Sequence, residues 1–119
     1  MMRRLVRAVI QNATITSGEG LTLKIDPVIL RAANILPLEE VEIVHYATGE
    51  RVTTFAEVAG TGEIISPRGR AGDTISIISW GVMHDGQTLA HTAKIVTLGV
   101  GNVVAAIGET AAEASPLSS

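Results

Sequence analysis

Short apolar runs of period two, separated by glycine-bearing turns, are the feature of this sequence that most constrains its fold. The longest run, residues 5–16, is rich in β-branched residues, as expected of a long strand. Shorter strands are predicted over residues 21–25, 42–46, 51–55, 64–65, 74–80 and 94–98. Many short strands joined by glycine turns, with one helix among them, predict an all-β barrel or sandwich.

A short helix is predicted where the strand pattern is interrupted. Asp26 followed by Pro27 marks a helix start, because the carboxylate caps free N–H groups and proline fits the first helical position. Residues 28–33 then form a short helix that ends at Asn34. Residues 47–50, Ala-Thr-Gly-Glu, join two strand-like runs and predict a hairpin turn.

Composition bounds the size and the class of the protein. The 119 residues are enough for one domain, and the three aromatic residues imply an aliphatic core. A net charge of −3 and a pI near 5.5 argue against nucleic acid as a partner, because phosphate binding needs a basic surface. There are no cysteines, and no apolar run approaches membrane-spanning length. We therefore expect a cytoplasmic protein that binds neither nucleic acid nor membrane.

The chain is expected to have two parts of different character. The all-β barrel or sandwich is predicted over residues 1–107, where the strand pattern lies. The remaining residues, 108–119, read GETAAEASPLSS and are small, polar and low in complexity. We predict that this second part is a disordered tail.

Motifs that carry chemistry are scarce. The histidines (His45, His84 and His91) lack metal-ligand spacing and are expected at the surface or on edge strands, so no metal site is predicted. Residues 99–102, GVGN, lack the full glycine pattern of a dinucleotide fingerprint and are read as a turn. Residues 67–70, PRGR, have two interpretations. They form either a solvated turn or a clamp for an anion, because guanidinium groups match carboxylate and phosphate geometry.

Five segments, taken in order, resemble the small pyruvoyl-dependent aspartate 1-decarboxylase family. They are MRRLVRAVIQNATIT, KIDPVILRAANIL, VEIVHYATGERVTTF, GEIISPRGRAGDTISIISW and HTAKIVTLGVGN. The resemblance spans about residues 2 to 104 and rests on the shared order of the segments rather than on one motif. It implies a double-psi β-barrel with short helical inserts that assembles as a homotetramer.

Members of this family make their own cofactor from a serine that follows a glycine. The hydroxyl attacks the preceding carbonyl, the ester eliminates, and the new amino end becomes a pyruvoyl group that acts as an electron sink. This chain has no Gly-Ser dipeptide, and the corresponding pair is Leu21 and Thr22 after a shortened loop. Threonine would leave a more crowded 2-oxobutanoyl group, and leucine lacks the conformational freedom of glycine. We predict that the chain is not self-cleaved and carries no pyruvoyl cofactor.

The other active positions of the family are kept in part. The resemblance places the substrate-binding arginine at Arg51 and a threonine implicated in processing at Thr54. The family's lysine, which helps to bind the substrate carboxylate, corresponds to Val9, and its proton-donating tyrosine corresponds to Phe55. Its asparagine before glycine corresponds to Arg68, whose charge would suit an anionic ligand. Arg51 and Thr54 are also ordinary strand residues, but their place within the aligned segment favours a retained pocket.

Three functions are compatible with the sequence. The first is an uncleaved protein that binds or acts on a small anionic metabolite, a carboxylate of the amino-acid type, in the inherited pocket between subunits. Arg51 and Arg68 would grip the carboxylate, while acid–base groups would come from Thr22, Tyr46 or His45. The second is a non-catalytic oligomeric barrel that binds a metabolite or a partner protein. The third is a genuine aspartate 1-decarboxylase, making β-alanine with a 2-oxoacyl group derived from Thr22. Fold resemblance does not choose among them, so the sequence leaves open whether the protein is an enzyme.

Overall fold

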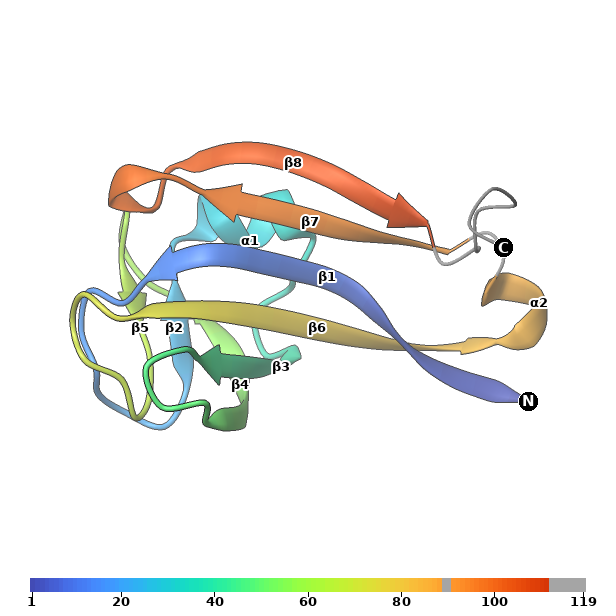
Figure 1. Cartoon of the computed structure of the whole chain (residues 1–119), viewed down its shortest axis with the longest axis horizontal. Coiled ribbons are helices and arrows are strands. Elements are labelled where there is room, and N and C mark those ends of the chain that lie inside the picture. The colour runs from blue at the N-terminus through green and yellow to red at the C-terminus, as the bar shows by residue number, and fades with distance from the viewer. Residues whose placement is uncertain (89–90, 112–119) are drawn as a thin grey trace.

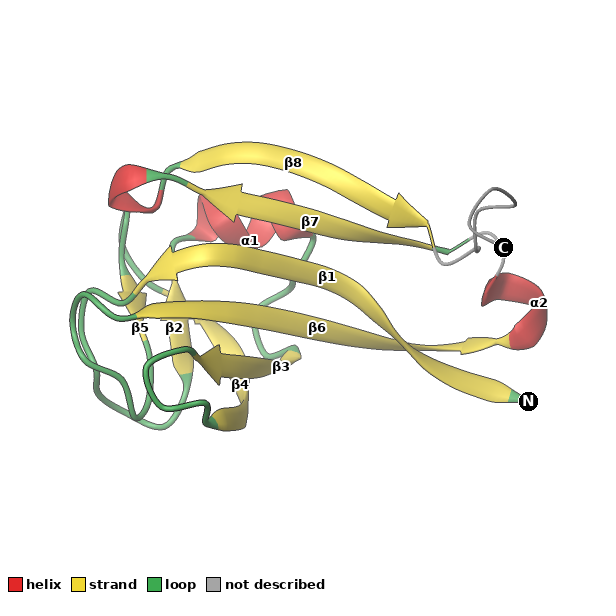
Figure 2. Ribbon diagram, viewed as in Figure 1, coloured by secondary structure: helices red, strands yellow, loops and turns green. Residues whose placement is uncertain are grey.

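The computed structural model describes residues 1–88 and 91–111, and this part of the chain is dominated by strands (Figures 1 and 2). Its strands are β1 (Met2–Thr14), β2 (Leu23–Ile25), β3 (Glu40–His45), β4 (Arg51–Val58), β5 (Ile64–Ile65), β6 (Thr74–His84), β7 (Thr92–Leu98) and β8 (Val104–Ala111). The helical elements between them are α1 (Pro27–Ala33), α2 (Asp85–Thr88) and the 3-10 turn η1 (Val100–Asn102).

The strands form one sheet in the order β5-β2-β4-β3-β6-β1-β7-β8. The long strand β1 lies antiparallel to β6 and parallel to β7, and its register against β6 shifts after Val6 and again after Ile10. Such bulges leave a residue unpaired, bend the strand and increase its twist. The sheet accordingly curls into the half-barrel seen in Figure 2. The all-β class is confirmed, and the curled sheet is consistent with the double-psi β-barrel that the resemblance implies.

The core inside this sheet is aliphatic, as the composition predicted. Its largest fully buried side chains are Ile10, Ile15, Leu23, Ile25, Ile29, Ile43, Ile64, Ile75, Ile77, Leu98, Val41 and Val96. Isoleucine and valine suit this role because their branched side chains pack well on a pleated surface. No aromatic side chain belongs to the buried hydrophobic cluster of the described residues.

The predicted helix start is confirmed. The Asp26 carboxylate accepts a hydrogen bond from the backbone N–H of Val28 at 2.8 Å, and its second oxygen accepts one from Gly62 at 2.8 Å. Asp26 therefore both caps α1 and ties the helix to the loop before β5. Asn34 ends the helix in the left-handed conformation, with φ of 56°.

Two loops, the one between β1 and β2 and the one between β5 and β6, pack against each other at one end of the barrel (left in Figure 1). The backbone N–H of Ser66 donates to the carbonyl of Ser17 at 3.0 Å. A Cβ built on Gly18 would lie 1.6 Å from the carbonyl oxygen of Gly69, so only glycine fits there. This contact fixes the path of the chain as it enters β2.

The structure corrects two expectations from the sequence. One of them, the predicted tail, includes residues that lie outside the described part of the chain. The predicted tail begins at Gly108, but β8 pairs with β7 as far as Ala111, so residues 108–111 belong to the sheet. Residues 112–119 lie outside the described residues. His45, expected at the surface or on an edge strand, is only 2% exposed and lies on the interior strand β3. No helix in the described residues is long and apolar enough to cross a membrane.

Candidate functional site

The peptide bond between Leu21 and Thr22 lies just before β2, beside the strand β4 with which β2 pairs in parallel. Thr54 of β4 donates its hydroxyl to the carbonyl oxygen of Leu21 at 2.7 Å. A donor on this oxygen would stabilise the negative charge that forms when a nucleophile attacks the carbonyl. The fold thus brings together two positions, Thr22 and Thr54, that are far apart in the sequence.

The hydroxyl of Thr22 faces a carboxylate that the sequence analysis missed. Thr22 Oγ1 donates to Glu57 Oε2 at 2.8 Å, and the contact is partly buried. A hydroxyl and a carboxylate at this distance have the geometry of a nucleophile and its base. One signal could have found Glu57: it stands six residues after Arg51, so period-two alternation places both side chains on one face of β4.

This face of the sheet, which we call the outer face, gathers three of the positions that the resemblance singled out. On β4 it comprises Arg51, Thr53, Phe55 and Glu57. The cross-strand register continues it over β3, β6 and β1 through Glu42, Ile78 and Val9. Directly paired residues point to the same side of a sheet. Val9 and Phe55, where the family has its lysine and tyrosine, therefore share the outer face with Arg51.

Arg51 is held across the β3–β4 hairpin by a carboxylate. Its Nη1 lies 2.6 Å from Glu42 Oε1, and the side chain of Arg51 is 61% exposed whereas that of Glu42 is 18% exposed. A guanidinium carries five N–H donors, so donors remain for a ligand. An ion pair this open to solvent contributes about 0–1 kcal/mol, which a ligand carboxylate can replace.

The remaining predicted residues lie apart from Thr22. Arg68 binds Glu50 at 2.5 Å on the exposed surface, so Arg51 and Arg68 bind different carboxylates. The hydroxyl of Tyr46 makes a short hydrogen bond to Ser76. The ring of His45 is buried near Gly69, and its Nε2 has no hydrogen-bond partner in the described structure. The arrangement makes Glu57, rather than these side chains, the ionisable group at Thr22.

Comparison with known families decides which protein family this site belongs to. The sequence model described as Aspartate decarboxylase matches residues 1–105. The chain belongs to the aspartate decarboxylase family. The match includes every strand that contributes to the outer face, and the resemblance seen in the sequence is confirmed.

Individual relatives agree with the family match. The chain is 32% identical over 118 residues to the aspartate 1-decarboxylase of Methylibium petroleiphilum, covering 90% of this chain and 98% of that protein. It is 32% identical over 121 residues to the aspartate 1-decarboxylase of Ralstonia pickettii, covering 92% and 100%. The aspartate 1-decarboxylase of Listeria monocytogenes is 33% identical over 109 residues, with 82% and 85% covered. The similarity therefore extends over most of each aspartate decarboxylase.

The residues present do not fit the pyruvoyl group of the aspartate decarboxylase family. Pyruvoyl derives from serine, whereas position 22 is threonine and follows leucine. Phe55, 38% exposed on the outer face, has no hydroxyl to donate, and Val9 has no charge to offer a carboxylate. The described residues also contain no group of three or more His, Cys, Asp or Glu side chains placed to hold a metal ion.

Proposed function

We propose that this member of the aspartate decarboxylase family stays uncleaved and binds or acts on a small carboxylate of the amino-acid type at the outer face. Arg51 carries the proposal, because its exposed guanidinium lies on the outer face and keeps unused N–H donors. A ligand carboxylate would bind this group through charge-assisted hydrogen bonds. Glu42, which contacts Arg51 on the same face, would accept from an ammonium group, which suits an amino-acid-type ligand.

Two features of the segment around Leu21 and Thr22 support an intact chain. The methyl group of Thr22 would crowd an attack of its hydroxyl on the neighbouring carbonyl. In the described structure, the backbone angle φ of Leu21 is not positive. Residue 21 therefore does not have the positive-φ conformation that glycine adopts more readily than leucine.

The intact mass of the purified wild-type protein tests this part of the proposal. We expect a single species near 12.4 kDa. Fragments of residues 1–21 and 22–119 would contradict it and would favour the alternative, a genuine aspartate 1-decarboxylase with a Thr22-derived 2-oxoacyl group. The hydrogen bond from Thr54 to Leu21 is the observation that favours this alternative. Thr22→Ala, which lacks the hydroxyl, is the matched control and should stay whole in either case.

The same proposal includes the assembly and the location of the protein. We propose a homo-oligomer, a tetramer by family resemblance, in the cytoplasm. The outer face is open in a single chain, where Leu21 is 87% exposed and Phe55 is 38% exposed. A ligand bound at Arg51 would therefore have solvent on one side. A neighbouring subunit would supply the second wall of the pocket.

Ligand-induced thermal stabilisation tests the binding role of Arg51. Any member of a panel of amino acids and dicarboxylates that binds should stabilise the wild type, by about 2.7 kcal/mol at a hundred times its Kd. Arg51→Ala removes charge-assisted hydrogen bonds and should weaken that ligand about 10- to 100-fold. Arg31→Ala removes an exposed arginine of α1 and should bind as the wild type does.

Two outcomes would count against the binding proposal. If no member of the panel stabilises the wild type, the non-catalytic barrel becomes the better description. If Arg31→Ala and Arg51→Ala weaken a ligand equally, binding depends on net charge rather than on the outer face.

A further inference from the structure

A cavity of about 250 Å³, lined by both polar and apolar residues, lies between the end of α1 and strands β1, β6, β7 and β8. The residues that matter in it are Arg7, Asn34, His91, Lys94 and Glu109. Lys94 pairs with Ala8 in the parallel register of β1 and β7, and Ala8 points to the opposite side of β1 from Val9. The cavity is therefore separated from the outer face by the thickness of the sheet.

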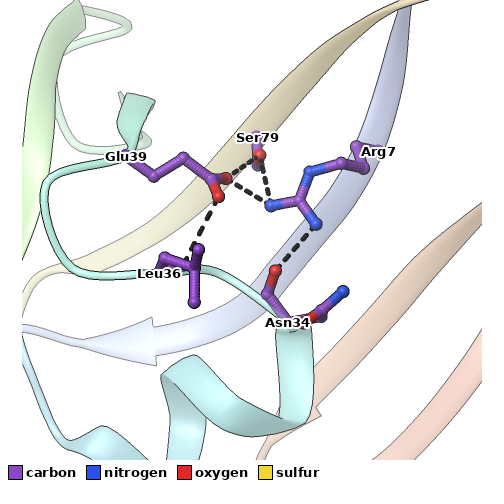
Figure 3. A network of polar contacts seen from close by, with 5 residues as sticks. All are labelled: Arg7, Asn34, Leu36, Glu39 and Ser79. Atoms are coloured by element: carbon purple, nitrogen blue, oxygen red, sulfur yellow. Dashed lines mark hydrogen bonds and ion pairs between the residues drawn. The ribbon is translucent and has the colours of Figure 1, made fainter.

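Arg7 is fixed at the wall of this cavity by a network of polar contacts (Figure 3). It lies in the bulge between Val6 and Ala8, and a bulge re-aims the side chain that it carries. Nη1 donates to the carbonyl of Asn34 at 2.7 Å, while Nη2 donates to Ser79 at 2.9 Å and pairs with Glu39. These contacts use three of the five guanidinium N–H groups, so Arg7 keeps donors at a fixed position.

The charges around the cavity favour an anion. Lys94 and Glu109 are direct partners across β7 and β8, yet no ion pair within 4.0 Å joins them in the described structure. Lys94 is half-buried, whereas Glu109, which also lines the cavity, is exposed on strand β8. Glu39 balances the charge of Arg7, so the charge left over at a half-buried position is the ammonium of Lys94.

We propose that this cavity is a binding site for a small oxyanion, a phosphate or carboxylate group, held by Lys94 and Arg7. The ammonium of Lys94 supplies the charge, and the unused N–H groups of Arg7 supply directed donors. His91 forms the rim, where its Nε2 donates to the carbonyl of Val6 at 2.6 Å and fixes the ring. This site goes beyond the proposed function, because it uses neither Arg51 nor the outer face.

The sequence offers a direct probe, because Lys24 and Lys94 are its two lysines. Reductive methylation of the full chain with ¹³C-formaldehyde keeps both charges and gives each lysine an NMR signal, assigned from the spectra of Lys24→Met and Lys94→Met. Titration with inorganic phosphate should shift the Lys94 signal saturably, with a Kd on the order of 1 mM or tighter, and leave the Lys24 signal in place. Sodium chloride at matched ionic strength controls for screening.

A second titration, with succinate in the Arg51→Ala background, distinguishes a carboxylate from a phosphate without interference from the outer face. Saturation by either anion supports the site and names its ligand chemistry. In thermal-shift assays with that anion, Lys94→Met should weaken its affinity about tenfold or more, and Lys24→Met should leave it unchanged. Failure of both anions to saturate the Lys94 signal overturns the proposal, as does equal loss in the two variants. Neither result bears on binding at Arg51, so the two proposals fail separately.

Discussion

A chain carrying Leu21→Gly together with Thr22→Ser is expected to cleave itself between residues 21 and 22. The two substitutions restore the Gly-Ser pair that the aspartate decarboxylase family uses, and Thr54 already donates to the carbonyl of residue 21 at 2.7 Å. Serine lacks the methyl group that crowds this carbonyl, and glycine adopts conformations that leucine resists. Intact-mass spectra should change from one species to fragments of residues 1–21 and 22–119 as the major products.

The contribution of Thr54 is measured by adding Thr54→Ala to this double variant. Loss of one donor on a developing oxyanion typically costs about 2.7–4 kcal/mol, so cleavage should slow by about 10²- to 10³-fold. Leu21→Gly alone keeps the threonine and serves as the control for the change at residue 21. If the double variant stays whole, the shortened loop or the contact with Glu57, rather than the two missing residues, has closed the site. If Thr54→Ala leaves the rate unchanged, its hydrogen bond has no part in the attack.

Gly18→Ala is expected to destabilise the fold by about 3 kcal/mol or more and to lower Tm by about 10 °C. The new Cβ would lie 1.6 Å from the carbonyl oxygen of Gly69 and 2.4 Å from its carbonyl carbon. Both atoms belong to the backbone, so neither can rotate away as a side chain would. The two loops must separate, and the segment that carries Thr22 would lose its support. Thermal unfolding followed by circular dichroism measures the change.

Gly108→Ala is the matched control for this experiment. Gly108 lies on the exposed strand β8, where an added Cβ would meet nothing within 4 Å. Alanine is the better strand residue, so we expect a change of about 0.5–1 kcal/mol or less in the stabilising direction. If Gly18→Ala melts at the same temperature as Gly108→Ala, the two loops are not in contact in solution.

Features that depend on neighbouring residues were predictable from the sequence. The helix start at Asp26 and Pro27 is local chemistry, because the cap bonds a backbone group two residues away. The hairpin around residues 47–50 was also predictable, because its turn residues lie between two strand-like runs. The structure pairs these two strands with each other. Strand β8 was missed, because VAAIGETA alternates poorly and is mostly exposed, so it gives no period-two signal.

The residues of the candidate site were also predictable only where local sequence marks them. Arg51 and Thr54 were found because they stand in a segment that resembles the family, and the structure shows what each contacts. Glu57 was missed, because no motif marks it and its relation to Thr22 depends on the parallel pairing of β2 with β4. Arg51 and Arg68 were expected to act together, but the structure pairs them with separate carboxylates.

The sequence by itself determined the family, the aliphatic all-β character and the absence of a Gly-Ser pair, because each of these is written in residue identity, order or short-range period. The tertiary structure decided which side chains share a face, through a register that joins Val9, Ile78, Glu42 and Thr53 across four strands. It also decided that Arg7 and Lys94 line one cavity, because a bulge in β1 and the pairing of β1 with β7 bring together residues 87 positions apart. Strand register and loop packing depend on contacts distant in sequence, and a short-range pattern does not encode them.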